Sequence, residues 1–333
     1  MKALIHRRFG PPSVVELAEY DRLDPSATEL LIKVRASAVN TGDWRIRAAA
    51  FPGILAIPGR LMFGLTRPRN PRLGSEFAGD VVAVGRNVTG FTPRDAVYGI
   101  KPGAGTSAEW IAIADDAAVA PIPDGLTYAQ AAALPFGGLC ALVFLHEYAR
   151  LAAGQRLLIV GATGGVGCYA VQIAKALGAH VTGVAGADSQ ALLESLGADT
   201  ALDYTRADPY SGADPFDVIF DTIGVLSPRQ ARALMTARGL FLPLNYGLRE
   251  IGAALINPLR HRKIRLAVNP DRAEDLRRLS AMVSAGAVRP VIAQIYPLSE
   301  AVAAHAHVES RHKHGAIVLA VDTPEALPPS SQR

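Results

Sequence analysis

The chain has 333 residues, of which 50% are hydrophobic and 19% are charged. This length and composition indicate a globular protein with room for two well-filled domains. The formal net charge of +4 comes from scattered basic residues, and only Arg67, Arg69 and Arg72 cluster, without interleaved aromatic side chains. We therefore expect no nucleic-acid partner.

Neither the cysteines nor the apolar runs point to a secreted or membrane protein. Two cysteines cannot form a disulfide framework or a four-thiolate zinc site. No signal-peptide core opens the chain, and the longest uncharged run, 125–145, is interrupted by Pro135, Gly137 and Gly138. We expect a cytoplasmic protein and do not expect membrane contact.

The first part of the chain, residues 1 to about 122, predicts a β-rich domain with Gly and Pro punctuation. The expected strands are 30–36, 79–85, one fed by the turn in 91–99, and 108–114. Residues 121–125, rich in turn-forming Pro, Asp and Gly, predict a connection between this β-rich part and the part that follows.

Helices and strands alternate after this connection, which predicts a parallel sheet with helices on both faces. The expected helices are 127–134, 139–150, 165–177, 188–196 and 228–236, and the expected strands are 157–160, 180–185, 217–221, 239–244 and 264–268. A charged amphipathic helix at 271–284 and a last strand at 315–321 follow. The Pro- and Ser-containing tail 322–333 is expected to be frayed.

A glycine-rich turn at 161–167 lies between the buried strand 157–160 and the helix that follows it. Its spacing is Ala162-x-Gly164-x-x-Gly167, with alanine where such motifs usually begin with glycine. Small residues let the backbone approach a diphosphate, and the helix start presents its N–H groups to it. We predict that the dinucleotide contacts are Ala162, Thr163, Gly164, Gly165, Val166 and Gly167.

Several short segments, in order along nearly the whole chain, resemble the zinc-independent, quinone oxidoreductase-like (zeta-crystallin-like) group of the medium-chain dehydrogenase/reductase superfamily. They are residues 39–47, 73–79, 123–126, 131–135, the glycine loop, 195–199 and 203–205. The resemblance implies an α/β protein with a GroES-like catalytic domain at 1–122 and a Rossmann NAD(P)-binding domain at 123–267. Residues 268–333 would return to the catalytic domain. It also implies a homodimer and an active site in the cleft between the domains.

The same resemblance bears on zinc. Zinc-dependent relatives place cysteine or histidine ligands where this chain has Asn40, Ser75 and Phe136, none of which offers a thiolate or an imidazole. A histidine group near the C-terminus, 305–314, is expected to be solvated surface rather than a metal site. We therefore predict no metal.

Catalytic candidates follow from the resemblance. Asn40 would lie near the nicotinamide, Asp43 and Arg45 at the substrate mouth, and Tyr246 would close the pocket. Arg45 can donate a hydrogen bond to a carbonyl oxygen but is a poor proton donor, because the guanidinium stays charged. Alternatively, Asn40 and Asp43 only cap a helix, or they do both.

The resemblance also names cofactor contacts: Thr222 and Asn245 at strand ends, Cys140, and Tyr204 or Arg206 at the adenosine end. The acid that binds the ribose in NAD-specific relatives is replaced by Ala185, and Asp188 would repel a 2′-phosphate. A lysine that relatives carry near the phosphates is replaced by Ala316. Because members of this family commonly use NADPH, the resemblance favours NADPH as the cofactor, and NADH is not excluded.

We interpret the chain as an NAD(P)H-dependent reductase that transfers hydride to quinones or activated C=C bonds (enones) without a metal. Its substrate would be a small hydrophobic carbonyl compound or quinone. The alternatives are an enoyl-thioester reductase of a biosynthetic pathway and a low-turnover NADPH-binding sensor or scaffold. The preferred interpretation of the apolar segment 51–65 is a lid over the cleft. The second is a subunit or domain contact. The third and least favoured is a shallow membrane contact assisted by Arg60, Arg67, Arg69 and Arg72.

Overall fold

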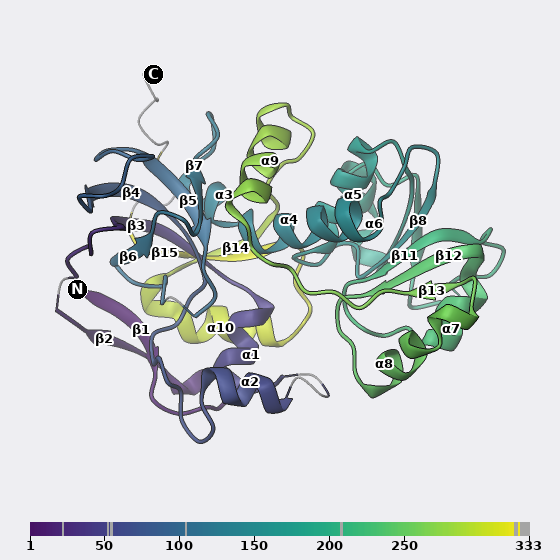
Figure 1. The fold of residues 1–333 in the computed structure, drawn as a ribbon, viewed down its shortest axis with the longest axis horizontal. Helices are drawn as coiled ribbons and strands as arrows, with labels where there is room; N and C mark the ends of the chain where they lie inside the picture. Colours follow the sequence, from purple (N-terminus) through teal and green to yellow (C-terminus); the bar gives the residue numbers. More distant parts are fainter. Residues whose placement is uncertain are drawn as a thin grey trace.

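Two lobes, each built around its own β-sheet, lie side by side (Figure 1). The computed structural model describes residues 1–21, 23–51, 53, 56–103, 105–206, 209–322 and 326. Among these residues, no helix is long and apolar enough to cross a membrane.

The first lobe contains a seven-stranded sheet in the order β14-β15-β3-β4-β5-β7, with β6 paired to β3. Its strands are β3 (Glu29–Val39), β4 (Glu76–Val84), β5 (Ala96–Ile100), β6 (Trp110–Ala114), β7 (Ala118–Pro121), β14 (Ile292–Pro297) and β15 (Ala316–Ala320). A separate hairpin-like pair joins β1 (Lys2–His6) and β2 (Val15–Glu19). Because β15 pairs with β3, the end of the chain completes the sheet that its beginning starts.

The second lobe contains a six-stranded sheet in which every pair is parallel, in the order β10-β9-β8-β11-β12-β13. Its strands are β8 (Arg156–Val160), β9 (His180–Ala185), β10 (Thr200–Asp203), β11 (Phe216–Asp221), β12 (Met235–Pro243) and β13 (Lys263–Ile264). The first strand in sequence, β8, lies at the centre of this sheet. The chain adds β9 and β10 on one side of β8 and then crosses over to add β11, β12 and β13 on the other side. This is the strand order of a doubly wound fold, which binds ligands at the carboxyl ends of the strands beside that switch point.

Helices cover both sheets. They are α1 (Thr41–Ala48), α2 (Ala56–Phe63), α3 (Tyr128–Ala132), α4 (Pro135–Leu142), α5 (Gly167–Ala176), α6 (Gln190–Ser195), α7 (Pro228–Leu234), α8 (Leu248–Leu255), α9 (Ala273–Ser284) and α10 (Ala301–Glu309). The largest buried apolar cluster includes Tyr98 of the first sheet, Leu139 of α4 and Phe220 of the second sheet. One core therefore joins the lobes.

Several predicted elements differ in extent from those observed. The expected helix 139–150 begins earlier, with Pro135 at its first turn where no N–H is needed, and continues after Leu142 as a π-helix, Val143–Tyr148. The expected helix 228–236 ends at Leu234, and the following strand starts at once. The expected strand 264–268 is only the two-residue β13.

The tail prediction is partly wrong. Asp322 forms ion pairs with Lys33 and Arg35, and the Ala326 carbonyl accepts a hydrogen bond from the Tyr128 N–H, so these two residues are held against the first lobe. The rest of the predicted frayed tail lies outside the described residues. The predicted domain boundaries at 122 and 267 remain predictions.

Candidate cofactor and active site

The glycine loop joins β8 to α5 at the switch point of the parallel sheet. Gly161 has a φ of +78°, and a Cβ there would lie 2.7 Å from Thr222 Oγ1. A Cβ at Gly167 would lie only 2.1 Å from the Gly161 carbonyl oxygen. Both positions therefore require glycine, one for its backbone conformation and one for close packing of the helix start.

Backbone amides in this loop are available to a ligand. Within the described part of the chain, the N–H groups of Thr163, Gly165 and Val166 donate to no acceptor. Unpaired amides at the start of a ten-residue helix form a favourable site for an anion. A Cβ at Gly164 would meet only the Gly161 carbonyl, at 3.3 Å, so the space beside that residue is open. The loop fits the diphosphate of a dinucleotide.

The carboxyl ends of β11 and β12 lie next to the glycine loop and form one wall of the candidate site. Asp221 accepts hydrogen bonds from the N–H groups of Gly224 and Leu226 and so shapes the turn after β11. Thr222 donates its hydroxyl to the Val160 carbonyl at 2.8 Å, which ties β11 to β8. The Asn245 side-chain amide donates to the Thr222 carbonyl at 3.3 Å. Thr222 and Asn245 thus lie together at the switch point.

Arg45 reaches this wall from the first lobe. It lies on α1, and its guanidinium donates to Asn245 Oδ1 across the boundary between the lobes. Burial and the nearby positive charge of Arg311 lower the pKa of Arg45. The guanidinium therefore lies in the gap between the lobes, held by an amide and not by a carboxylate.

A buried hydrogen-bond network joins Asn40 and Phe136, two of the positions at which the resemblance implies metal ligands in zinc-dependent relatives, through Glu76. Asn40 caps α1 by accepting from the N–H groups of Gly42 and Asp43, and it also donates to Glu76 Oε2 at 2.8 Å. Glu76 Oε1 accepts from the Phe136 N–H at 2.7 Å. Asn40 therefore does cap a helix, as the alternative stated. Its side-chain oxygen caps α1, while its NH2 group is free to bond to Glu76.

The acids of this network hold protons more tightly than exposed carboxyl groups do. Burial raises the pKa of Glu76 to about 8, although its hydrogen bonds from Asn40 and Phe136 oppose the shift. Burial likewise raises the pKa of Asp43 to about 6, against the opposing hydrogen bonds from Ser75 and the Asn40 N–H. The Ser75 hydroxyl donates to Asp43 Oδ1 at 2.6 Å.

The segment that follows α10 covers the glycine loop, and the sequence analysis missed its role. The Gly315 N–H donates to the Thr163 carbonyl at 3.0 Å, and His314 Nδ1 lies 3.3 Å from Thr163 Oγ1. Lys313 Nζ lies 3.1 Å from where a Cβ of Gly165 would be. Ala316 does replace the lysine that relatives carry, but Lys313 brings an amine to the loop from three positions earlier in the chain.

Lys313 also connects the loop with the buried acids. Its ammonium donates to the Gly315 carbonyl, and the charges of Glu76 and Asp43 favour its protonated form. Burial outweighs their effect and lowers the pKa of Lys313. The sequence feature that could have indicated this role is a lysine, Lys313, two residues before the glycine that precedes the last strand.

Three other predicted site residues are not joined to this set by any described hydrogen bond. Tyr246 is half-buried next to Asn245, and its role remains a prediction. The Tyr204 ring lies 3.4 Å from where a Cβ of Gly186 would be, just after β9, which agrees with a place at the adenosine end. Cys140 is 3% exposed within the main core, where burial raises the pKa of its thiol, and its cofactor contact also remains a prediction.

The expectation that the C-terminal histidines form a solvated surface is correct for His312 and His314, which are exposed, but not for the other two. His305 is fully buried in the first lobe, and His307 pairs with the Tyr296 hydroxyl at 3.0 Å. Among the described residues, no group of three or more His, Cys, Asp or Glu side chains could hold a metal ion.

The predicted lid segment contains α2 and also residues outside the described part of the chain. A Cβ at Gly53 would lie 3.1 Å from Gly247 Cα, so this segment touches the second lobe just before α8. The Phe51 and Phe63 rings stack at 5.6 Å. The contact places the segment across the boundary between the lobes.

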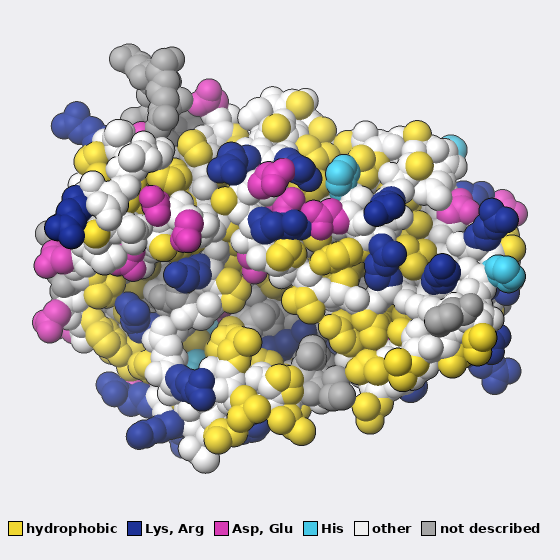
Figure 2. All heavy atoms as spheres, in the orientation of Figure 1, with side chains coloured by type: hydrophobic (Ala, Val, Ile, Leu, Met, Phe, Trp, Pro, Cys, Tyr) yellow, Lys and Arg dark blue, Asp and Glu magenta, His cyan; other side chains and the backbone are white. Residues whose placement is uncertain are grey.

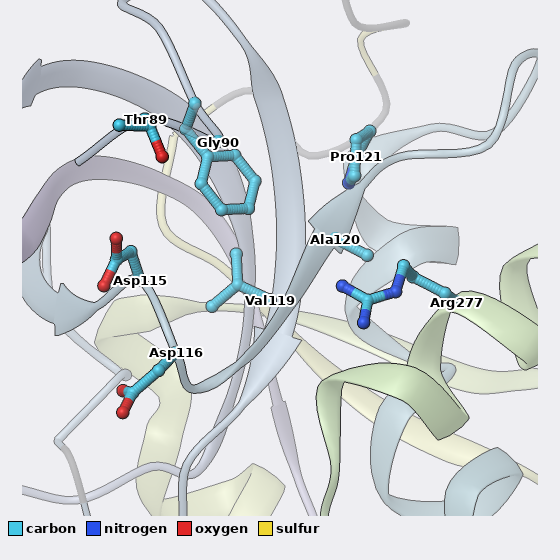
Figure 3. A pocket seen from close by; sticks show the side chains of 9 residues that line it. Thr89, Gly90, Asp115, Asp116, Val119, Ala120, Pro121 and Arg277 are labelled. Atoms are coloured by element: carbon cyan, nitrogen blue, oxygen red, sulfur yellow. The ribbon is translucent and has the colours of Figure 1, made fainter.

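A pocket on the first lobe lies apart from these residues. Its lining includes Phe91, Asp115, Val119 and, from α9, Arg277 (Figure 3). None of the candidate site residues lines it.

Comparisons with known proteins agree with this architecture. Residues 26–186 match the alcohol dehydrogenase GroES-like domain, and residues 196–319 match the zinc-binding dehydrogenase family. The chain is 31% identical over 324 residues to the mitochondrial NAD(P)H oxidoreductase RTN4IP1 of Mus musculus, covering 88% of this chain and 82% of that protein.

Two solved structures are similar over almost the whole chain. The quinone oxidoreductase from Coxiella burnetii has a TM-score of 0.85 at 28% identity and covers 97% of this chain and 99% of its own. A mycobacterial protein complexed with NADPH has a TM-score of 0.81 at 25% identity, covering 96% and 100%.

Fold, loop and relatives together define a two-lobed, dinucleotide-binding oxidoreductase. The chain belongs to the medium-chain dehydrogenase/reductase superfamily, and among its relatives are quinone oxidoreductases. The resemblance inferred from the sequence and the expected pairing of a GroES-like domain with a parallel-sheet domain are thus confirmed.

Proposed function

We propose that this protein is an NADPH-dependent reductase of quinones or enones that works without a metal ion. The observation that carries the proposal is the row of unpaired amides at Thr163, Gly165 and Val166, which faces the switch point where Thr222 and Asn245 meet Arg45. This arrangement supports a dinucleotide whose nicotinamide end lies beside the guanidinium. When bound, the cofactor supplies a hydride.

The chain's own residues orient the acceptor and stabilise charge. Arg45 would donate N–H groups to the acceptor oxygen as negative charge develops there, while Asn245 fixes the direction of the guanidinium. Since a guanidinium does not give up its proton, this is electrostatic stabilisation and not acid catalysis. Hydride transfer to quinones and α,β-unsaturated carbonyls needs no acid, because their carbonyl group takes up the charge; water would then protonate the hydroquinone anion or enolate to complete the product.

The donor chemistry supports a metal-free site. Asn40, Ser75 and Phe136 offer no thiolate or imidazole, and Glu76, the remaining carboxylate, already accepts two hydrogen bonds from Asn40 and Phe136. A cation there would have no thiolate or imidazole ligand among these residues and would compete with both bonds for Glu76. The name of the zinc-binding dehydrogenase family therefore does not extend to the chemistry proposed for this chain.

NADPH is the proposed cofactor. A relative of known structure carries it, and Lys313, His314 and Arg311 line the segment over the loop with groups that suit phosphates. NADH is the alternative cofactor, because Asp188, three residues after Ala185, would repel a 2′-phosphate. We also propose a homodimer, as the resemblance implies, and a cytoplasmic location, as expected from the sequence.

A substrate panel tests the proposal. NADPH oxidation would be followed with quinones, enones and a crotonyl-thioester, before and after treatment with a chelator, and the products would be identified by mass spectrometry. We expect turnover of quinones or enones, a saturated product from enones, and no effect of the chelator. Loss of activity on chelation with recovery on adding zinc would contradict the metal-free proposal.

The same panel separates the alternatives. A strong preference for the crotonyl-thioester would make the protein an enoyl-thioester reductase. Tight NADPH binding without turnover of any acceptor would make it a sensor or scaffold.

A further inference from the structure

Two helices on different lobes expose apolar side chains at the same edge of the molecule. On and just after α2, Ile57, Leu61, Met62 and Leu65 are between 52% and 71% exposed. On and after α8, the exposed members are Leu248, Leu255 and Leu259, at 72%, 77% and 85%. Figure 2 shows apolar side chains along the lower edge of the view, where Figure 1 places α2 and α8. Exposed apolar side chains gathered in this way mark an interaction surface.

The two patches form one surface because their segments touch. Gly53, shortly before α2, packs against Gly247, which caps the start of α8. We call the exposed parts of α2, α8 and the residues after each helix the apolar rim. It runs along the boundary between the lobes.

The charge of the rim is one-sided. Residues 56–75 contain four arginines and no acid, and residues 245–270 contain five basic residues and only one acid, Glu250. The whole chain has a net charge of only +4, so everything outside these two segments is net acidic. Glu250 is itself buried and paired with Arg249.

The rim's cations are available to a partner. Among the described residues, no carboxylate forms an ion pair with Arg60, Arg67 or Arg69 on one side, or with Arg260 and Arg262 on the other. Arg60 donates to the Leu65 carbonyl at 2.9 Å and Arg69 to the Met62 carbonyl at 3.4 Å. These bonds hold the cations next to the apolar side chains.

We propose that the apolar rim docks on the surface of a lipid bilayer that contains anionic lipids. Apolar side chains flanked by unpaired cations suit the boundary between acyl chains and negatively charged headgroups, where each nearby Lys or Arg adds electrostatic attraction. A second copy of the chain would instead place the two sets of unpaired arginines against each other. The inference goes beyond the proposed reaction and does not depend on it.

Vesicle binding tests the proposal with the full-length protein. We expect co-sedimentation with vesicles of phosphatidylcholine and phosphatidylglycerol, little binding to phosphatidylcholine alone, and weakening at high salt. The variant Arg60→Gln/Arg67→Gln/Arg69→Gln should bind at least about tenfold more weakly. The matched control Arg86→Gln/Arg94→Gln/Arg277→Gln, which alters three exposed arginines after β4 and on α9, should change the affinity less than about twofold.

The apolar contribution is tested separately with Leu61→Asn/Leu255→Asn. This variant should lose vesicle binding by about tenfold while keeping its melting temperature and its affinity for NADPH. Equal weakening by the rim and control arginine variants would overturn the proposal, because it would indicate binding by net charge alone. No vesicle binding by the wild type, or conversion of a dimer into a monomer by the leucine variant without a change in vesicle binding, would also overturn it.

Discussion

Individual residues of the candidate site perform two tasks at once, and this limits what their types alone reveal. Asn40 is both the cap of α1 and the donor that holds Glu76, and Thr222 ties two strands together while its carbonyl holds Asn245. The sequence indicated these positions through the resemblance. It could not show that Lys313 reaches the glycine loop, because that contact joins residues about 150 positions apart through packing of the last strand.

Glu76 should make stability depend on pH. Glu76 keeps its proton up to about pH 8 in the folded protein, because burial raises its pKa, whereas in the unfolded chain it releases the proton near pH 4.5. The folded state therefore binds more protons between these values, and the free energy of unfolding falls as the pH rises through this window. In Glu76→Gln this loss should be smaller, by up to about 1.4 kcal/mol per pH unit. Denaturant unfolding from pH 5 to 8 measures it, with the exposed Glu194→Gln as a control that should follow the wild type.

Arg45 should matter for turnover more than for cofactor binding. Because its guanidinium bonds to Asn245 and faces the gap between the lobes, Arg45→Ala removes a donor from the acceptor site and leaves the glycine loop intact. We expect kcat to fall by at least about tenfold and the Kd for NADPH to change less than about threefold, as for the loss of one charge-stabilising donor. Steady-state kinetics and fluorescence titration give the two values. Equal losses in both would mean that Arg45 contacts the cofactor and not the acceptor.

The elements around the site were predictable where their pattern was local. The alternation in 157–221 fixed β8, α5, β9 and β11 to within a few residues, because each is a buried strand or an amphipathic helix with clear punctuation. The strands of the first lobe were harder to predict. Strands β1 and β14 were missed, because the short segments that form them do not show which strand each pairs with. The helix predicted at 139–150 began too late, since α4 starts at Pro135, and its π-helical part was not predicted because a π-helix leaves no distinct sequence pattern.

Helices α1 and α10 are joined by a buried basic cluster that should weaken the first lobe in acid. Arg47 is fully buried and pairs with Glu309 at 2.6 Å, and the buried rings of His6 and His305 lie near it without described hydrogen-bond partners. Burial, and then the charge of Arg47, lower the pKa of His6 to about 4 and that of His305 to about 3.

This cluster gives a stability change of opposite sign to that of Glu76. Below pH 6.5 the unfolded chain protonates His6 and His305 while the folded protein keeps both neutral, so the free energy of unfolding falls as the pH drops towards 4. His305→Leu should reduce this fall by up to about 1.4 kcal/mol per pH unit. Unfolding curves from pH 7 to 4 measure it. A profile parallel to that of the wild type would show that His305 does not resist protonation.

At the scale of the whole molecule, the two lobes are held in one arrangement by contacts that surround the glycine loop. Arg45 bonds to Asn245, Arg311 donates to the Ile223 carbonyl at 3.1 Å, and Gly315 donates to Thr163. A dinucleotide in the loop would touch segments of both lobes. Saturating cofactor should therefore raise the melting temperature, since a ligand at a hundred times its Kd adds about 2.7 kcal/mol to the free energy of unfolding.

The most direct measurement of the central claim is NADPH binding by isothermal titration to the wild type, Gly164→Val and Gly167→Ala, with the melting temperature of each recorded without cofactor. Because the space beside Gly164 is open, the valine should occupy the place of the diphosphate, so binding should be lost while the melting temperature is kept. Gly167→Ala would force a Cβ to 2.1 Å from the Gly161 carbonyl, so its melting temperature should fall. NADPH affinity unchanged in Gly164→Val would contradict the placement of the cofactor on this loop.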